Sequence, residues 1–145
     1  MILGGLVARY ADAWNDHDPA ACAACFVPDG VRIWCIRARP ELPGSPFPRF
    51  AGRPAIAEAI GAFMASVPDL HLEVLALSEG SDERVWTEWQ LTGTHQHDWL
   101  DWSAHGESVH LQGVSVFRIG AGGLREERAY WDSLLLSDAP QPARA

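Results

Sequence analysis

Two side chains near predicted strand ends have the chemistry to move protons. His95 closes the run 85–95, in which strand alternation places Thr87, Trp89 and His95 on the more apolar face. An imidazole titrates near neutral pH, so His95 can act as a general base or donate a hydrogen bond to a ligand carbonyl. The alternative is a histidine at the rim of the fold that binds water or a neighbouring strand.

Asp132 is the second candidate for proton transfer. It follows Tyr130 and Trp131 at the end of the last predicted strand. If its side chain enters an apolar interior, desolvation favours the protonated form and makes it a usable acid or base near neutrality. The competing interpretation is a turn or helix-capping aspartate in front of residues 133–136. We therefore predict His95 and Asp132 as catalytic residues, with both alternatives open.

Two further patterns contain residue types that bind metals. The segment 95–105 holds three histidines and two aspartates, and Cys22 and Cys25 form a Cys-x-x-Cys pair. The alternative for the first pattern is that its side chains are solvated in a loop. The alternative for the second is that the two cysteines are small residues buried in a helix. We expect no metal and no other cofactor. The odd number of cysteines, with Cys35 as the third, indicates a reduced, cytoplasmic protein.

Composition excludes several classes of function. The 145 residues carry a net charge of −8, and all eleven basic residues are arginines. The absence of lysine excludes Schiff-base catalysis and a P-loop, and the acidic balance disfavours nucleic acid and anionic lipid as partners. No apolar stretch is long enough to span a membrane, and the first residues lack the basic start of a secretory signal. We expect a small-molecule partner, because seven tryptophans supply flat apolar walls.

Periodicity predicts helices followed by strands. Helical spacing of apolar residues predicts helices at 6–15, 19–26 and 54–66, the second of them capped by Asp18 and Pro19. Residues 40–54, with five prolines and two glycines, are expected to form a loop. Strands are expected at 31–36, 70–78, 83–95, 106–119 and 123–131. This order predicts an α+β fold with one domain over residues 1–140 and a flexible tail over 141–145.

Several stretches together resemble a known family. Residues 50–56, followed by 67–70, resemble the third helix of SnoaL-like polyketide cyclase domains and the segment after it. Residues 89–95 resemble the family's strand that ends in Gly-Thr-His. Residues 106–118 and 124–126 complete the pattern, which covers about residues 5–137. The resemblance implies the NTF2-like fold, a cone in which three helices and a curved mixed or antiparallel sheet enclose an apolar pocket, and it implies a homodimer through the outer sheet face.

The resemblance also implies a site within the cone. The residues expected to contact a ligand there are Tyr10, Trp14, Trp34, Phe63, Trp89, Ser115 and Trp131. Trp99 and Trp102 are expected to fold over the pocket mouth or to lie in a dimer contact. The chain departs from the family at two positions, because it has Ser115 in place of a pocket histidine and Ala129 in place of the acid–base aspartate.

These features favour a cofactor-independent enzyme that binds a polycyclic or aromatic molecule. Cyclisation, isomerisation or assisted hydroxylation are the expected reactions. The alternative is a ligand-binding or scaffold protein of the same fold without catalysis, which the residues at 115 and 129 favour. A third interpretation is an epoxide-hydrolase-like Asp-Arg-Asp group around Arg128 and Asp132.

Overall fold

Helices and strands follow the predicted order, with changed boundaries. A computed structural model describes residues 2–36, 47–100 and 102–132, so the expected tail at 141–145 lies outside the described residues. The helices are α1 (Ile2–Asn15), α2 (Pro19–Ala24) and α3 (Arg53–Ser66). The strands are β1 (Phe26–Cys35), β2 (Arg49–Ala51), β3 (His71–Glu79), β4 (Arg84–Thr94), β5 (Ser108–Gly120) and β6 (Gly123–Trp131).

Local sequence explains where the helices begin. Asp18 is the N-cap of α2, where its carboxylate accepts a hydrogen bond from the amide of Ala21 at 3.0 Å, and Pro19 occupies the first turn. This confirms the predicted cap. In α1, Val7, Tyr10 and Trp14 are buried at helical spacing. None of the helices in the described part of the chain has the length and apolarity needed to span a bilayer.

Two predicted boundaries near the first strand are wrong. The second helix ends at Ala24 instead of continuing to residue 26, and β1 begins at Phe26, five residues before the predicted start of the strand at residue 31. Its pairing with β6 shifts register between Phe26 and Val31, so the strand absorbs the Pro-Asp-Gly sequence as an irregularity. The short strand β2 lies within the segment 40–54 that was expected to be a loop, because three residues give no periodic signal.

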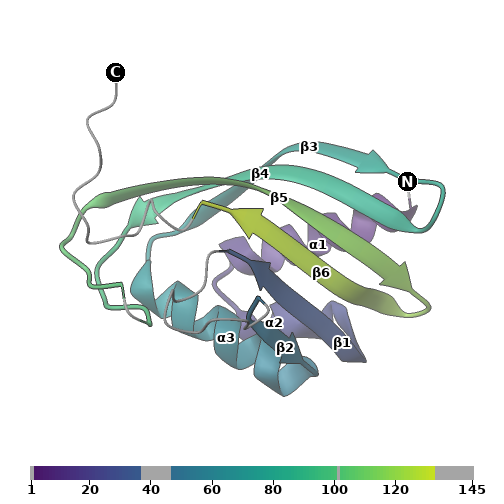
Figure 1. Cartoon of the computed structure of the whole chain (residues 1–145), viewed down its shortest axis with the longest axis horizontal. Helices are drawn as coiled ribbons and strands as arrows, with labels where there is room; N and C mark the ends of the chain where they lie inside the picture. The colour runs from purple at the N-terminus through teal and green to yellow at the C-terminus, as the bar shows by residue number, and fades with distance from the viewer. Residues whose placement is uncertain (1, 37–46, 101, 133–145) are drawn as a thin grey trace.

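The six strands form one bent sheet with the helices against one side (Figure 1). The strand order is β2-β1-β6-β5-β4-β3. The pairing of β1 with β6 is parallel and the other pairings are antiparallel. Side chains from α1, α3 and the inner face of the sheet build the buried core. The predicted α+β architecture is therefore confirmed.

A close approach between β4 and β5 fixes one tryptophan on the inner face. Gly113 is paired with Trp89 across the two strands. A Cβ atom added to Gly113 would lie 2.4 Å from Trp89 Cζ2 and 2.6 Å from the carbonyl oxygen of Tyr130. The missing side chain therefore leaves the space in which the Trp89 ring lies against the strand.

We expect Gly113→Ala to lower the free energy of unfolding by about 1–3 kcal/mol, because the added methyl group meets a ring and a backbone oxygen. Gly5→Ala is the matched control, because its Cβ meets nothing within 4 Å and Gly5 lies in α1. The control should raise stability by up to about 1 kcal/mol through helix propensity. Urea denaturation of both variants measures the difference, and equal stabilities would contradict the close contact.

Candidate functional site

A small cavity lies between the inner face of the sheet and the helices α1 and α3. Its volume is about 60 Å³. Most of its wall is aromatic or aliphatic, and the polar side chains in it come from α1, β1, β4, β5 and β6. These polar residues are Tyr10, Arg32, Thr87, Ser115 and Glu127.

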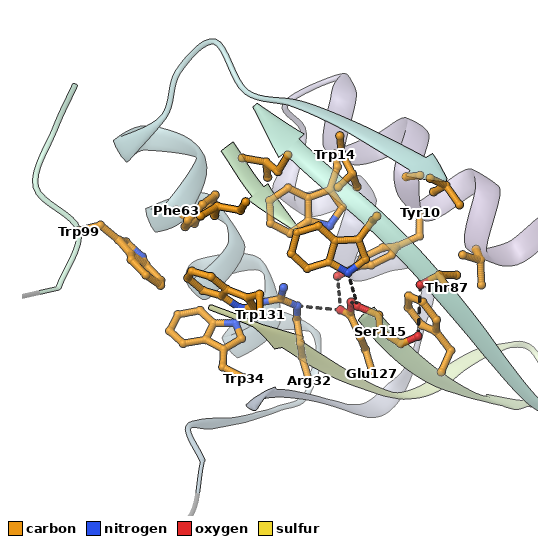
Figure 2. A pocket seen from close by; sticks show the side chains of 18 residues that line it. Tyr10, Trp14, Arg32, Trp34, Phe63, Thr87, Trp99, Ser115, Glu127 and Trp131 are labelled. Carbon is orange, nitrogen blue, oxygen red and sulfur yellow. Dashed lines mark hydrogen bonds and ion pairs between the residues drawn. The ribbon is translucent and has the colours of Figure 1, made fainter. Parts of the chain in front are cut away.

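Three of these side chains converge on the carboxylate of Glu127, whereas Thr87 donates to the backbone carbonyl of Ser115 (Figure 2). The hydroxyl of Tyr10 donates to Oε1 at 2.6 Å, and Nε of Arg32 donates to the same oxygen at 2.8 Å. The hydroxyl of Ser115 donates to Oε2 at 2.9 Å. Nε1 of Trp89 in turn donates to Ser115 Oγ at 3.0 Å. Glu127 is 4% exposed, so this group of hydrogen bonds is shielded from solvent.

The groups around Glu127 can all donate hydrogen bonds to its carboxylate. Arginine and the indole N–H can only donate. Ser115 Oγ therefore accepts from Trp89 and has its one hydrogen available for Glu127, while Arg32 donates to the other oxygen. Both carboxylate oxygens thus have hydrogen-bond partners inside the protein.

The sheet register brings the two charged residues together. Arg32 and Glu127 are direct partners in the parallel pairing of β1 with β6. The guanidinium also lies over two indole rings, with its carbon 5.5 Å from the Trp14 centroid and 5.8 Å from the Trp34 centroid. Burial alone lowers the pKa of Arg32, but neighbouring Tyr10 and Glu127 outweigh it and raise the pKa. The arginine therefore stays charged in the interior.

Tyr10 is held in its protonated form. Burial raises its pKa well above the ordinary value, and the negative charge of Glu127 adds to that effect. Its ring makes edge contacts with Phe26 and Phe117 at centroid distances of 5.5 and 5.8 Å. The phenol is thus a positioned hydrogen-bond donor at the carboxylate.

Aromatic rings form the other end of the cavity. Trp99 packs against Trp34 at 5.1 Å, Phe63 at 5.0 Å and Trp131 at 5.9 Å between ring centroids. Trp102 stacks on the outer side of Trp99, with ring centroids 5.0 Å apart and ring planes 15° apart. In Figure 2, Trp99 lies at the end remote from Thr87 and Ser115. The cavity therefore has one polar end and one aromatic end.

The residues predicted as ligand contacts all lie in the cavity wall. They are Tyr10, Trp14, Trp34, Phe63, Trp89, Ser115 and Trp131. Trp99 is also in the wall, and Trp102 stacks on it.

The two residues predicted to be catalytic do not line the cavity. The strand alternation ends at Thr94, so His95 starts the following loop, where its buried ring has Nδ1 3.3 Å from Glu107 Oε1. Asp132 is exposed directly after β6. Trp131 lines the cavity, so the next side chain in the strand direction lies on the opposite face.

The structure also shows where the side chains of the predicted Asp-Arg-Asp group and of the predicted metal ligands lie. Arg128 donates from Nε to Glu126 at 3.0 Å, and its side chain is 51% exposed, so this ion pair lies on the outer face of the sheet. The Asp-Arg-Asp group around Arg128 is therefore not part of the cavity. Within residues 2–36, 47–100 and 102–132, no three histidine, cysteine or acidic side chains gather as a metal site.

Sequence reasoning missed the charged pair at the polar end. Strand alternation could have placed both residues on the inner face, because Glu127 shares its face with Ala129 and Trp131, and Arg32 shares its face with Trp34. An arginine and a glutamate on the inner faces of two strands must be neutralised in the interior. That requirement identifies them as partners.

We expect stability to fall as pH rises above about 10, because the unfolded chain then loses the Tyr10 proton that the folded state retains. In Tyr10→Phe this alkaline decline should be shallower, although the variant loses a hydrogen bond to a charged group worth about 1.5–3 kcal/mol at neutral pH. Urea denaturation between pH 8 and pH 11 measures both effects. Parallel alkaline declines in the two proteins would contradict a buried, protonated Tyr10.

Solved structures with the same fold carry different proposed activities. A proposed SnoaL-like polyketide cyclase from Jannaschia sp. CCS1 has a TM-score of 0.76 and 17% identity, over 95% of this chain and 93% of that one. A proposed isomerase from Bacillus subtilis has a TM-score of 0.73 and 19% identity, over 90% and 86%. AclR, a proposed hydroxylase from Streptomyces galilaeus, has a TM-score of 0.69 and 21% identity, over 89% and 77%.

At these identities the structural likeness shows the fold alone. Comparison with the curated proteins finds no match to this chain. The SnoaL-like domain family matches residues 7–127, which is most of the sequence and includes both Arg32 and Glu127. The chain belongs to the SnoaL-like domain family.

Proposed function

We propose that this protein is a cofactor-independent enzyme that binds an aromatic or polycyclic small molecule and moves a proton within it. The buried carboxylate of Glu127 carries this proposal, because it lies in the wall of an otherwise mainly apolar cavity beside two proton donors and a cation. Buried ionisable groups that converge in a cavity are typical of functional sites. The names of structural relatives, which include a cyclase and an isomerase, agree with such chemistry.

In the proposed step, Glu127 removes a proton from a carbon next to a ligand carbonyl. The electron pair of the broken C–H bond moves to the carbonyl oxygen and forms an enolate. The guanidinium of Arg32 stabilises this negative charge, and the phenol of Tyr10 donates to it. Return of the proton to another carbon gives an isomer. Attack of the enolate carbon on a second carbonyl of the ligand instead closes a ring: the π bond of that carbonyl breaks, and the resulting alkoxide takes the proton back from Glu127. The indole walls hold the ring system through flat apolar contacts.

A binding protein without catalysis is the second candidate. Both oxygens of Glu127 already accept hydrogen bonds from the protein, which is the arrangement of a structural ion pair. Ala129, at the position where the family's cyclases have an acid–base aspartate, also favours this candidate.

Deuterium exchange into 2-tetralone, a bicyclic aromatic ketone, separates the candidates. We expect the wild-type protein to accelerate exchange of the protons next to the carbonyl in D2O, measured by NMR. Glu127→Gln should reduce the acceleration by about 10²–10⁴-fold, the usual contribution of a general base. Binding of 2-tetralone without accelerated exchange would favour the binding protein.

Two matched variants control this experiment. Glu126→Gln makes the same chemical change one residue away, where the side chain pairs with Arg128 on the outer face, and should leave exchange unchanged. Asp132→Asn tests the residue chosen from the sequence. Loss of exchange in Asp132→Asn but not in Glu127→Gln would overturn the assignment to Glu127. Circular dichroism of each variant shows that it is folded.

We also propose that the protein forms a homodimer through the outer face of the sheet. Trp86, Val114 and Tyr130 are exposed there and line a groove of about 320 Å³ together with several charged residues. Large apolar side chains gathered on one exposed face are typical of interaction surfaces. Sedimentation should give a dimer for the wild type and a monomer for Trp86→Glu, and a monomeric wild-type protein would contradict the proposal.

A further inference from the structure

The cavity is too small for the proposed ligand in its present shape. Its volume of about 60 Å³ corresponds to roughly two water molecules. An engineered protein cavity that binds benzene measures about 150 Å³. A ligand with two fused rings therefore needs part of the wall to move.

Trp99 is the part of the wall that is best placed to move. Among the described residues that line the cavity, it alone belongs to neither a helix nor a strand. The other lining side chains start from α1, α3 or the strands of the sheet, where ladders of backbone hydrogen bonds hold them. The backbone of Trp99 forms a bridge with Trp102 through two hydrogen bonds of 3.0 and 2.9 Å. Displacing such a loop segment disrupts fewer interactions than displacing a strand or a helix.

The contacts of Trp99 hold its ring but leave its polar atom without a partner. The indole packs on Trp34, Phe63 and Trp131, and the residue is 2% exposed. Nε1 is buried with no acceptor among the residues that the structure describes. In water this N–H would gain a hydrogen bond, which partly offsets the packing lost when the ring leaves. Leu100, the next residue, is 64% exposed, so the chain reaches solvent directly beyond the ring.

We propose that Trp99 determines which ligands this site accepts: its indole occupies the outer part of the binding site, and a planar bicyclic aromatic ligand takes its place. The space left by an indole fits a flat system of two fused rings. The rings of Trp34, Phe63 and Trp131 that now contact Trp99 would then contact the ligand. This inference rests on the proposed small-molecule function and names the shape of the ligand.

Binding of 2-naphthol to Trp99→Ala tests the inference. The wild-type protein must displace its own indole before the probe binds, which weakens the apparent affinity by the fraction of molecules that are open. We expect Trp99→Ala to bind 2-naphthol about tenfold more tightly or better, measured by titration calorimetry. Equal or weaker binding would overturn the inference.

Trp14→Ala is the control for simple enlargement of the cavity. Trp14 also lines the cavity, but it is anchored in α1. Its truncation removes a ligand contact and should not tighten binding. Tighter binding in both variants would overturn a special role for Trp99. Absence of binding in the wild type and in Trp99→Ala would contradict the proposed small-molecule site as well.

Hydrogen exchange of indole N–H groups in the wild-type protein gives a second readout that does not depend on a folded variant. We expect the Trp99 N–H to exchange at least about tenfold faster than that of Trp89, which donates to Ser115. Exchange of the Trp99 N–H only at the rate of global unfolding would overturn the inference. Saturation with 2-naphthol should also shift the Trp99 indole resonance. If 2-naphthol binds but this resonance does not shift, the proposal that the ligand displaces Trp99 is wrong, whereas the proposed small-molecule binding is not contradicted.

Discussion

The buried pair of Arg32 and Glu127 constrains how the strands of this domain can pair. Two charges in an apolar interior are tolerated only when they neutralise each other and their remaining polar atoms are hydrogen-bonded. The parallel register of β1 against β6 brings the two residues directly opposite each other. A shift by one residue in either strand would move one charge to the outer face and leave the other unpaired. The ion pair therefore favours this register and places a carboxylate inside the cone.

The packed aromatic rings add to the stability of the core, and they also limit the volume of the site. The rings of Trp34, Phe63, Trp99 and Trp131 pack against one another at the end of the cavity opposite Ser115. Such packing stabilises a domain of this size, but every ring packed inward reduces the space for a ligand. The small volume of about 60 Å³ is the result of that balance. Under the proposed displacement of Trp99, a ligand would exchange one aromatic contact for another.

Sequence patterns were sufficient for the architecture and for the aromatic wall. Helical spacing and strand alternation depend on local periodicity, so they identified the elements and placed Trp89 on the inner face, whereas Ser115 was expected there from the family resemblance. The strand β2 is too short to produce a pattern, and the bulge in β1 interrupts one. Proton-transfer residues were harder to predict, because their positions depend on where a strand ends. The strand β4 ends at Thr94, one residue earlier than predicted, so His95 lies in the loop that follows.

The hydrogen-bond chain from Trp89 through Ser115 links sheet packing to the chemistry of Glu127. Gly113 leaves space for the Trp89 ring, and the ring directs its N–H to Ser115 Oγ. As long as Glu127 is ionised, the single hydroxyl hydrogen of Ser115 donates to Oε2. When Oε2 takes up a proton, that hydroxyl must rotate and become an acceptor, because two hydrogens cannot occupy one hydrogen bond. A serine makes this change by rotation of one bond, without movement of the strand. Ser115, at a position where the family's cyclases have a histidine, can therefore support both protonation states of the carboxylate beside it.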